Sequence, residues 1–215
     1  MPLSLCGTVE NAKCSCYNNG ENRCQGISSV LSDLQQTVKE LTKTSFLEFA
    51  RERWSVRSYS GKSVEQNKIE KILKAADIAP TAVNYQPQKI YVLESPDALR
   101  KIRGITNSTY NAPLVFLVCS DAERSWHSSF AAGYDSGEMD ASIVGTHMML
   151  EAKDLGLGSV WVLLFDPQKV RRAFDLPQNI RPHFLLAVGY PSDTARPYRP
   201  WHDVFREQSD IVTRL

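Results

Sequence analysis

The sequence lacks an excess of charge of either sign. Its 25 Lys and Arg residues almost balance 24 Asp and Glu residues, so the net charge is +1. Because nucleic acids and membrane surfaces attract strongly cationic proteins, we expect neither as a partner. The longest apolar run, Ala112 to Cys119, is far shorter than the roughly 20 residues of a membrane-spanning helix. The first residues also lack the cationic and apolar regions of a secretory signal. The expected compartment is therefore the cytoplasm.

Motifs of several enzyme classes are also missing. The sequence contains neither the Gly-x-x-x-x-Gly-Lys phosphate loop nor the full Gly-x-Gly-x-x-Gly dinucleotide fingerprint. No serine lies in a Gly-x-Ser-x-Gly elbow, which argues against a hydrolase of that type. The four histidines, at positions 127, 147, 183 and 202, do not have zinc-ligand spacing. We therefore expect neither a zinc enzyme nor a phosphate-loop enzyme.

Cysteine is scarce beyond the N-terminal segment. Cys119 ends an apolar run and is interpreted as a buried core thiol. The remaining cysteines lie within the first 24 residues, separated by seven, one and seven residues: Cys6, Cys14, Cys16 and Cys24. This spacing lacks the two-residue gaps of zinc-ribbon and ferredoxin sites. We assign no metal to it. Free thiols, a small metal or iron–sulfur site, and disulfides remain alternatives.

The chain is long enough for one substantial core. It has 215 residues, 42% of them hydrophobic. Residues 1–44 are predicted to be a Cys-containing extension that ends in an amphipathic helix over 27–41. Ser45 and Glu48 then form a capping-box pattern, which marks the start of the main domain, 45–215.

Helical and strand-like patterns alternate through this domain. Apolar spacing predicts helices over 64–79 and 139–155, with a stop at Gly156 and a short helix after Asp166. Apolar runs predict strands at 89–93, 114–119, 160–164 and 184–188. A Pro- and Arg-rich tail follows. The pattern indicates a sheet covered by helices.

Three polar constellations stand out along the chain. In the first, Arg53, Ser55 and Arg57 alternate on an extended segment, so their side chains can converge on one side. Two guanidinium groups and a hydroxyl suit a phosphate. A solvated basic surface is the alternative.

The second and third constellations are loops. Residues 79–87 form a polar loop bracketed by Pro80 and Pro87, either a ligand-contacting segment or a rigid connection. The segment 155–162 carries Gly156 and Gly158 at the end of a predicted helix. These glycines allow a close backbone approach, although a helix C-cap alone also explains Gly156.

In this order and spacing, the three constellations resemble the FMN-dependent nitroreductase family. Tyr110-Asn111-Ala112-Pro113, Asp140, Phe165-Asp166-Pro167 and Gly189-Tyr190-Pro191 add to the resemblance, which spans Phe46 to the C-terminus. It implies an α+β fold, a three-layer α/β/α sandwich around a mixed, mostly antiparallel sheet. It also implies an intertwined homodimer with FMN sites at the interface.

The resemblance also implies which residues bind FMN. The phosphate and ribityl chain would contact 53–57, the flavin would be reached by 80–84 of the other subunit, and 158–164 would line its ring. A C-terminal arginine would complete the phosphate site: Arg206 by its His-x-x-x-Arg pattern, Arg199 as the alternative and Arg196 third. The implied residues are Arg53, Trp54, Ser55, Arg57, Pro80, Thr81, Ala82, Asn84, Gly158, Ser159, Trp161, Val162, Leu163 and Leu164.

The implied activity is a ping-pong reduction of small planar acceptors, such as nitroaromatics and quinones, by NADH or NADPH. Because the flavin performs the hydride chemistry, no catalytic side chain is expected. Dehalogenation, ene reduction and flavin fragmentation on the same fold are alternatives, as is a non-catalytic redox sensor. Residues 121–135, with Trp126, His127, Phe130 and Tyr134, would form an aromatic lid over the flavin or else a plain surface excursion.

Overall fold

The computed structural model describes residues 45–215. The predicted N-terminal extension, its helix over 27–41 and the four N-terminal cysteines lie outside the described residues. Residues 47–215 form one compact unit, which contains the sheet and its helices.

Four strands form an antiparallel sheet in the order β1-β2-β4-β3. The two central strands are the most apolar, and nearly every residue of β2 is buried because both faces of the sheet are covered. A single parallel bridge, between Ser55 and Ser159, adds the extended segment after α2 to the sheet edge at β3. The strands are β1 (Gln88–Leu93), β2 (Leu114–Asp121), β3 (Gly158–Val162) and β4 (Ile180–Gly189).

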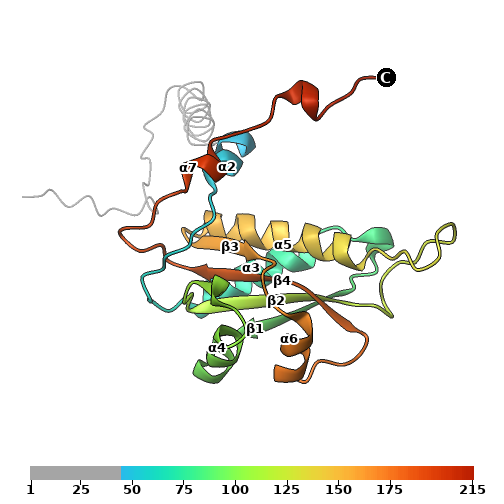
Figure 1. Cartoon of the computed structure of the whole chain (residues 1–215), viewed down its shortest axis with the longest axis horizontal. Coiled ribbons are helices and arrows are strands. Elements are labelled where there is room, and N and C mark those ends of the chain that lie inside the picture. The colour runs from blue at the N-terminus through green and yellow to red at the C-terminus, as the bar shows by residue number, and fades with distance from the viewer. Residues whose placement is uncertain (1–44) are drawn as a thin grey trace, which may run out of the picture. The chain divides into compact units, whose positions relative to one another are not determined.

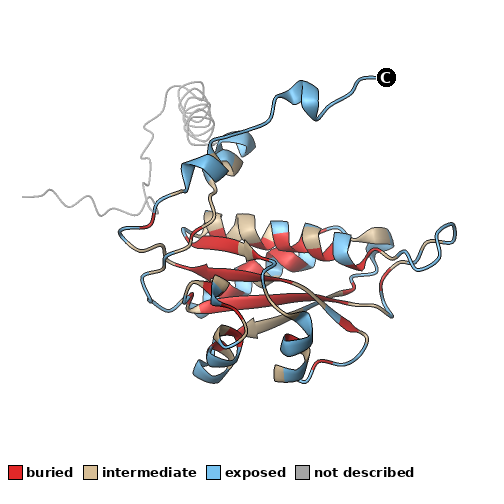
Figure 2. Cartoon of the chain, in the orientation of Figure 1, coloured by how far each residue is buried: buried red, intermediate tan, exposed pale blue. Residues whose placement is uncertain are grey.

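Helices cover both faces of this sheet (Figure 1). Alternate strand residues divide between two cores, as the pleat requires: Phe116 and Phe184 pack with α3 and α5, whereas Leu117 and Leu185 pack with α4 and α6. Figure 2 shows the buried residues concentrated in the sheet and on the inner sides of the helices. The predicted three-layer α+β sandwich is confirmed. The helices are α3 (Gln66–Ile78), α4 (Pro96–Arg103), α5 (Gly137–Asp154) and α6 (Pro167–Ala173).

Most predicted elements are present with small shifts at their ends. Helix α5 begins two residues before the predicted start, and Gly156 follows it at φ 75°, in agreement with a helix C-cap. Strand β3 ends at Val162 rather than at Leu164. Helix α4 was not expected; Ser95 caps it by accepting a hydrogen bond from the Ala98 N–H. The remaining short elements are α2 (Phe46–Glu52), α7 (Arg199–His202) and the 3-10 turns Ala82–Asn84, Asn107–Thr109 and Gln208–Asp210.

Candidate functional site

The segment Arg53–Arg57 is fixed to the edge of the sheet. The Val56 N–H donates to the Ser159 carbonyl oxygen over 2.9 Å, next to the Ser55–Ser159 bridge. The two backbones approach so closely that a Cβ on Gly158 would clash with the Val56 side chain. Gly158 is therefore required where the strand meets this segment. Two of the predicted site segments, far apart in sequence, are thus adjacent in the fold.

The side chains of this segment line a small pocket of about 40 Å³. Arg53, Ser55 and Arg57 are all half-buried and, with Trp54, form one side of it. The other side comes from Tyr198, Trp201 and His202, in and next to α7. The Arg57 guanidinium carbon lies 5.2 Å from the centroid of the Trp201 ring, a cation–π distance.

The pocket is electrostatically prepared for an anion. Within the described part of the chain, no carboxylate forms an ion pair with Arg53 or Arg57. Burial lowers the pKa of Arg53, because desolvation disfavours its charged form. The guanidinium remains protonated and in need of a counter-charge, since the ordinary pKa of arginine lies far above neutral. Arg57 donates to the Ser55 carbonyl oxygen over 3.2 Å, which leaves donors of its fork available.

The three candidate arginines of the C-terminal tail do not line this pocket. Arg206 donates to the Asp210 carbonyl oxygen over 3.2 Å, and Arg196 donates to the carbonyl oxygens of Asp193 and Ala195. Arg199 begins α7 but does not line the pocket. The tail contributes aromatic and imidazole groups instead, which sequence reasoning did not assign. The available signal was His202 of the His-x-x-x-Arg pattern, with Trp201 beside it.

The residues after Ser159 differ in orientation. The Trp161 ring stacks on Phe184 with the centroids 3.5 Å apart, on the α3/α5 side of the sheet. Val162 is buried on the α4/α6 side. Leu163 and Leu164 follow the strand and are 70% and 77% exposed. The residues of β3 itself are buried or half-buried, so the exposed surface here is that of the two leucines after the strand.

Loop 79–87 is a tight turn with unusual backbone angles. Thr81 accepts hydrogen bonds from Asn84 N–H through its carbonyl oxygen and from Gln86 N–H through its hydroxyl. Val83, Asn84 and Gln86 have φ angles of 46°, 57° and 51°. L-residues rarely adopt this left-handed region, and a β-branched residue such as Val83 is the most disfavoured. None of Pro80, Thr81, Ala82 and Asn84 lines the arginine pocket.

Comparison with known proteins decides the family. The model of the nitroreductase family matches residues 50–110 and 103–190. The chain belongs to the nitroreductase family. A relative from Archaeoglobus fulgidus, provisionally named an NADH dehydrogenase/NAD(P)H nitroreductase, is 32% identical over 148 residues, 66% of this chain and 82% of its own length.

Solved structures of nitroreductases agree with this assignment. The crystal structure of a nitroreductase family protein from Clostridium difficile 630 is 40% identical, with a TM-score of 0.74 over 79% of this chain and 98% of that one. An FMN-dependent nitroreductase from Clostridium difficile R20291 is 25% identical, with a TM-score of 0.59 over 71% of this chain and 91% of that one. The predicted family and fold are thus confirmed.

Segment 121–135 projects as a hairpin. His127 and Asp135 form an antiparallel bridge, and the Ser128 N–H donates to the Tyr134 carbonyl oxygen over 3.0 Å. Phe130, at its tip, is 99% exposed. A cavity of about 760 Å³ lies along its base, lined by Tyr134 and Asp135 of the hairpin, Met139 and Ile143 of α5, and Arg181 and His183 of β4.

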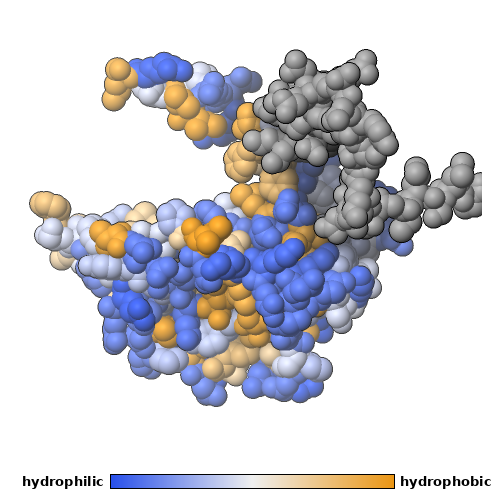
Figure 3. All heavy atoms as spheres, turned by 180° about the vertical axis from the view of Figure 1, so that it is seen from behind, coloured by the Kyte–Doolittle hydropathy of each residue, from blue (hydrophilic) through white to orange (hydrophobic). Residues whose placement is uncertain are grey.

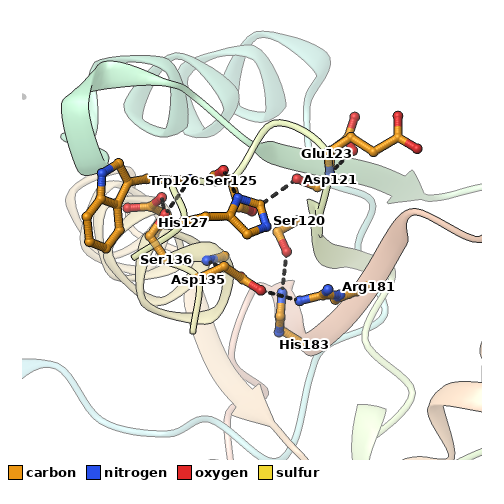
Figure 4. A network of polar contacts seen from close by, with 12 residues as sticks. Ser120, Asp121, Glu123, Ser125, Trp126, His127, Asp135, Ser136, Arg181 and His183 are labelled. Carbon is orange, nitrogen blue, oxygen red and sulfur yellow. Dashed lines mark hydrogen bonds and ion pairs between the residues drawn. The ribbon is translucent and has the colours of Figure 1, made fainter. Parts of the chain in front are cut away.

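Polar contacts hold the base of this hairpin (Figure 4). Arg181 pairs with Asp135 over 2.6 Å, and the Ser120 hydroxyl lies 2.7 Å from His183 Nε2. Burial lowers the pKa of His183, although the charge of Glu138 acts in the opposite direction.

Among the described residues, no helix combines the length and hydrophobicity needed to cross a membrane.

Proposed function

We propose that the chain is an FMN-dependent oxidoreductase that takes hydride from NADH or NADPH and passes it to small planar acceptors by a ping-pong mechanism. Nitroaromatics and quinones are the expected acceptor classes. The family assignment supports a flavin oxidoreductase, and the names of the Archaeoglobus and Clostridium relatives carry NAD(P)H and FMN respectively.

The arginine pocket against β3 is the observation that carries this proposal. It supplies two guanidinium groups and a hydroxyl, and neither guanidinium forms an ion pair with a carboxylate among residues 45–215, which fits the phosphate of FMN. The Val56–Ser159 contact joins the same segment to β3, and the exposed Leu163 and Leu164 follow this strand. One FMN molecule could therefore place its phosphate in the arginine pocket and its flavin ring beside β3.

The chain's own residues then have positioning roles. Arg53, Ser55 and Arg57 bind the phosphate and fix the register of the cofactor, while the backbone of 158–164 lines the ring. FMN, when bound, supplies the hydride chemistry. The cavity of about 760 Å³ beside the hairpin has the size of a small-molecule site. Its lining combines the Tyr134 ring and the aliphatic Met139 and Ile143 with polar groups of both charges, which suits a planar, polar acceptor.

We further propose a homodimer in which loop 79–87 of a second copy completes each FMN site. In one chain, this loop does not line the arginine pocket, so a second copy would bring the two together. Met139 and Ile143, one turn apart on α5, are 49% and 39% exposed and give this helix an apolar surface. Figure 3 shows further apolar surface on the last segment of the chain. The exposed apolar residues of this tail are Trp201, Val204, Phe205, Ile211, Val212 and Leu215.

The deciding experiment is an absorption spectrum of the purified protein under anaerobic conditions. The chromophore is released by heat and identified, and NADH and then NADPH are added to the holoprotein. We expect released FMN, bleaching of the bands by at least one donor, and their return when a nitroaromatic or quinone is added. Free FMN with the same additions is the control for reaction in solution.

Steady-state kinetics and mass determination complete the test. Initial rates with both substrates varied should give parallel double-reciprocal lines, as a ping-pong mechanism requires. Light scattering should give twice the 24.2 kDa of the chain. Bands that bleach with neither donor would refute the NAD(P)H role and favour the sensor alternative. A protein that cannot be reconstituted with FMN would refute the proposal altogether.

A further inference from the structure

Asp140 is a buried carboxylate in the first turn of α5, and it connects two segments of the proposed site. Asp140 is only 2% exposed. Oδ1 accepts a hydrogen bond from the Ala82 N–H over 2.8 Å, and Oδ2 accepts one from the Ser136 hydroxyl over 2.6 Å. A buried acid is costly to desolvate, and two short charge-assisted hydrogen bonds offset that cost.

The first contact anchors loop 79–87. Ala82 immediately precedes Val83 and Asn84, both in the left-handed region. Non-glycine residues in this region are strained and persist only where their surroundings determine the conformation. The Ala82 N–H is directed into the buried carboxylate rather than to solvent. Asp140 thus holds the loop at the residue where its strained part begins.

The second contact anchors the hairpin. Ser136 is 1% exposed, and its hydroxyl oxygen accepts a hydrogen bond from the Trp126 N–H over 3.1 Å. The Ser136 N–H donates in return to the Trp126 carbonyl oxygen over 2.9 Å. Figure 4 shows Trp126 and Ser136 at the base of the hairpin, beside the Asp135–Arg181 pair. The hydroxyl of Ser136 therefore connects Asp140 to the hairpin segment that contains Trp126.

We propose that Asp140 is a positioning residue that sets the flavin-contacting loop and the aromatic hairpin relative to each other. An ionised carboxylate only accepts hydrogen bonds, so it fixes the direction of both donors at once. Ser136 serves the hairpin alone. This inference rests on the proposed function for its catalytic consequence, but the coupling itself is a property of the protein without substrate.

Hydrogen exchange followed by mass spectrometry tests the coupling on the full chain. In Ser136→Ala we expect faster exchange in peptides covering 122–136, by about tenfold, because the hairpin loses a hydrogen bond linked to a charged group. Peptides covering 79–87 should exchange as in the parent protein, since Asp140 still accepts from Ala82. In Asp140→Asn, both regions should exchange faster, because the amide replaces one of the two acceptor oxygens with an NH2 donor and its remaining oxygen carries no full charge.

Ser95→Ala is the matched control. It removes a side-chain hydrogen bond of similar kind at the start of α4, on the opposite face of the sheet. It should change neither region. Uniformly faster exchange in all variants, control included, would show a loss of global stability and overturn the proposal. Unchanged exchange at 122–136 in Ser136→Ala would overturn it as well.

Kinetics supply the second readout. Ser136→Ala should raise the KM for the acceptor by about tenfold, with kcat and the Kd for FMN within about twofold of the parent values. Asp140→Asn should weaken FMN binding as well. Equal effects of both variants on FMN and acceptor would contradict separate roles. If the parent protein neither binds FMN nor oxidises NAD(P)H, the proposed function fails, whereas the exchange pattern still decides the coupling.

Discussion

The arginine pocket and the Asp140 network are both polar, but their donors and acceptors are used differently. In the pocket, Arg53 and Arg57 have no carboxylate partner among the described residues. In the network, both oxygens of Asp140 are occupied by protein donors. The pocket keeps its capacity for an external anion, whereas the network is complete within the chain.

This difference assigns ligand binding to the arginine pocket and structural stabilisation to the Asp140 network. A group whose charge is uncompensated in the protein loses little internal bonding when it is mutated, so its loss appears mainly in ligand affinity. A group whose partners are internal leaves buried donors without an acceptor, so its loss appears in local stability and motion. Substitutions on each side should therefore differ in whether FMN affinity or protein stability changes more.

The largest effect is expected for Arg57→Met, which keeps an apolar stem and removes the guanidinium. Affinity for FMN should fall about 100-fold, the loss expected for strong charge-assisted hydrogen bonds to phosphate. The urea midpoint should change little. Fluorescence titration of the apoprotein with FMN measures the affinity.

Arg100→Met is the control for Arg57→Met. Arg100 pairs with Asp97 on the exposed side of α4, far from the pocket in sequence and fold. FMN affinity should remain at the parent value. If Arg57→Met destabilised the protein as strongly as it weakened FMN binding, Arg57 would be a structural residue and the pocket would not differ from the network.

Gly158→Ala should give the next largest effect, here on stability. The new Cβ would meet the Val56 side chain and force the Arg53–Arg57 segment away from β3. We expect a loss of about 2 kcal/mol in the free energy of unfolding, as for other overpacked sites, and weaker FMN binding. Gly104→Ala is the control, because a Cβ there makes only ordinary contacts, the nearest at 3.4 Å. Urea denaturation measures the free energy of unfolding of both variants. Parent-like stability of Gly158→Ala would show that the backbones of segment 53–57 and β3 can separate without cost.

Val83→Gly should produce a smaller change with the opposite sign. Val83 has a φ of 46° and is 64% exposed, so glycine relieves backbone strain without opening a cavity. The free energy of unfolding should rise by about 1 kcal/mol. Val83→Ala keeps the Cβ and should show no such gain. A loss of stability in the glycine variant would mean that the left-handed backbone is not strained.

Much of the fold is predictable from local pattern. The apolar spacing of 64–79 and 139–155 predicts α3 and α5, and apolar runs predict all four strands to within a few residues. Helix α4 was not predicted because it has only eight residues, few of them apolar, and because its cap is a single serine. The prediction extended β3 to Leu164 because Leu163 and Leu164 are as hydrophobic as strand residues. In the structure both are exposed and the strand ends at Val162.

The site is only partly predictable for a related reason. Arg53, Ser55 and Arg57 line one pocket, but Trp54 lines it too, so simple alternation along an extended segment does not account for the whole lining. No local pattern, however, joins Asp140 to Ala82, which lie 58 positions apart. The positive φ of Val83 is equally unpredictable from the sequence, because valine is among the residues that least favour this conformation. Contacts of the tail, such as Trp201 with Arg57, depend on tertiary packing alone.

The smallest predicted effect concerns pH and the base of the hairpin. Burial lowers the pKa of His183, so the folded protein takes up a proton there only at a lower pH than the unfolded chain, whose histidines titrate near 6.5. As pH falls from 7 to 5, the unfolded state binds the proton first, and the free energy of unfolding decreases.

His183→Gln should make that decrease smaller by about half a kcal/mol, a value reduced for partial solvent exposure. Glutamine can retain a hydrogen bond to the Ser120 hydroxyl, which lies 2.7 Å from His183 Nε2. Urea midpoints at pH 7 and pH 5 measure the difference. Between pH 7 and 8, the variant and the parent should change in parallel, which provides an internal control. An equal decrease in both proteins below pH 7 would mean that His183 takes up its proton in the folded state, and that the network at the hairpin base is more open to water than its contacts indicate.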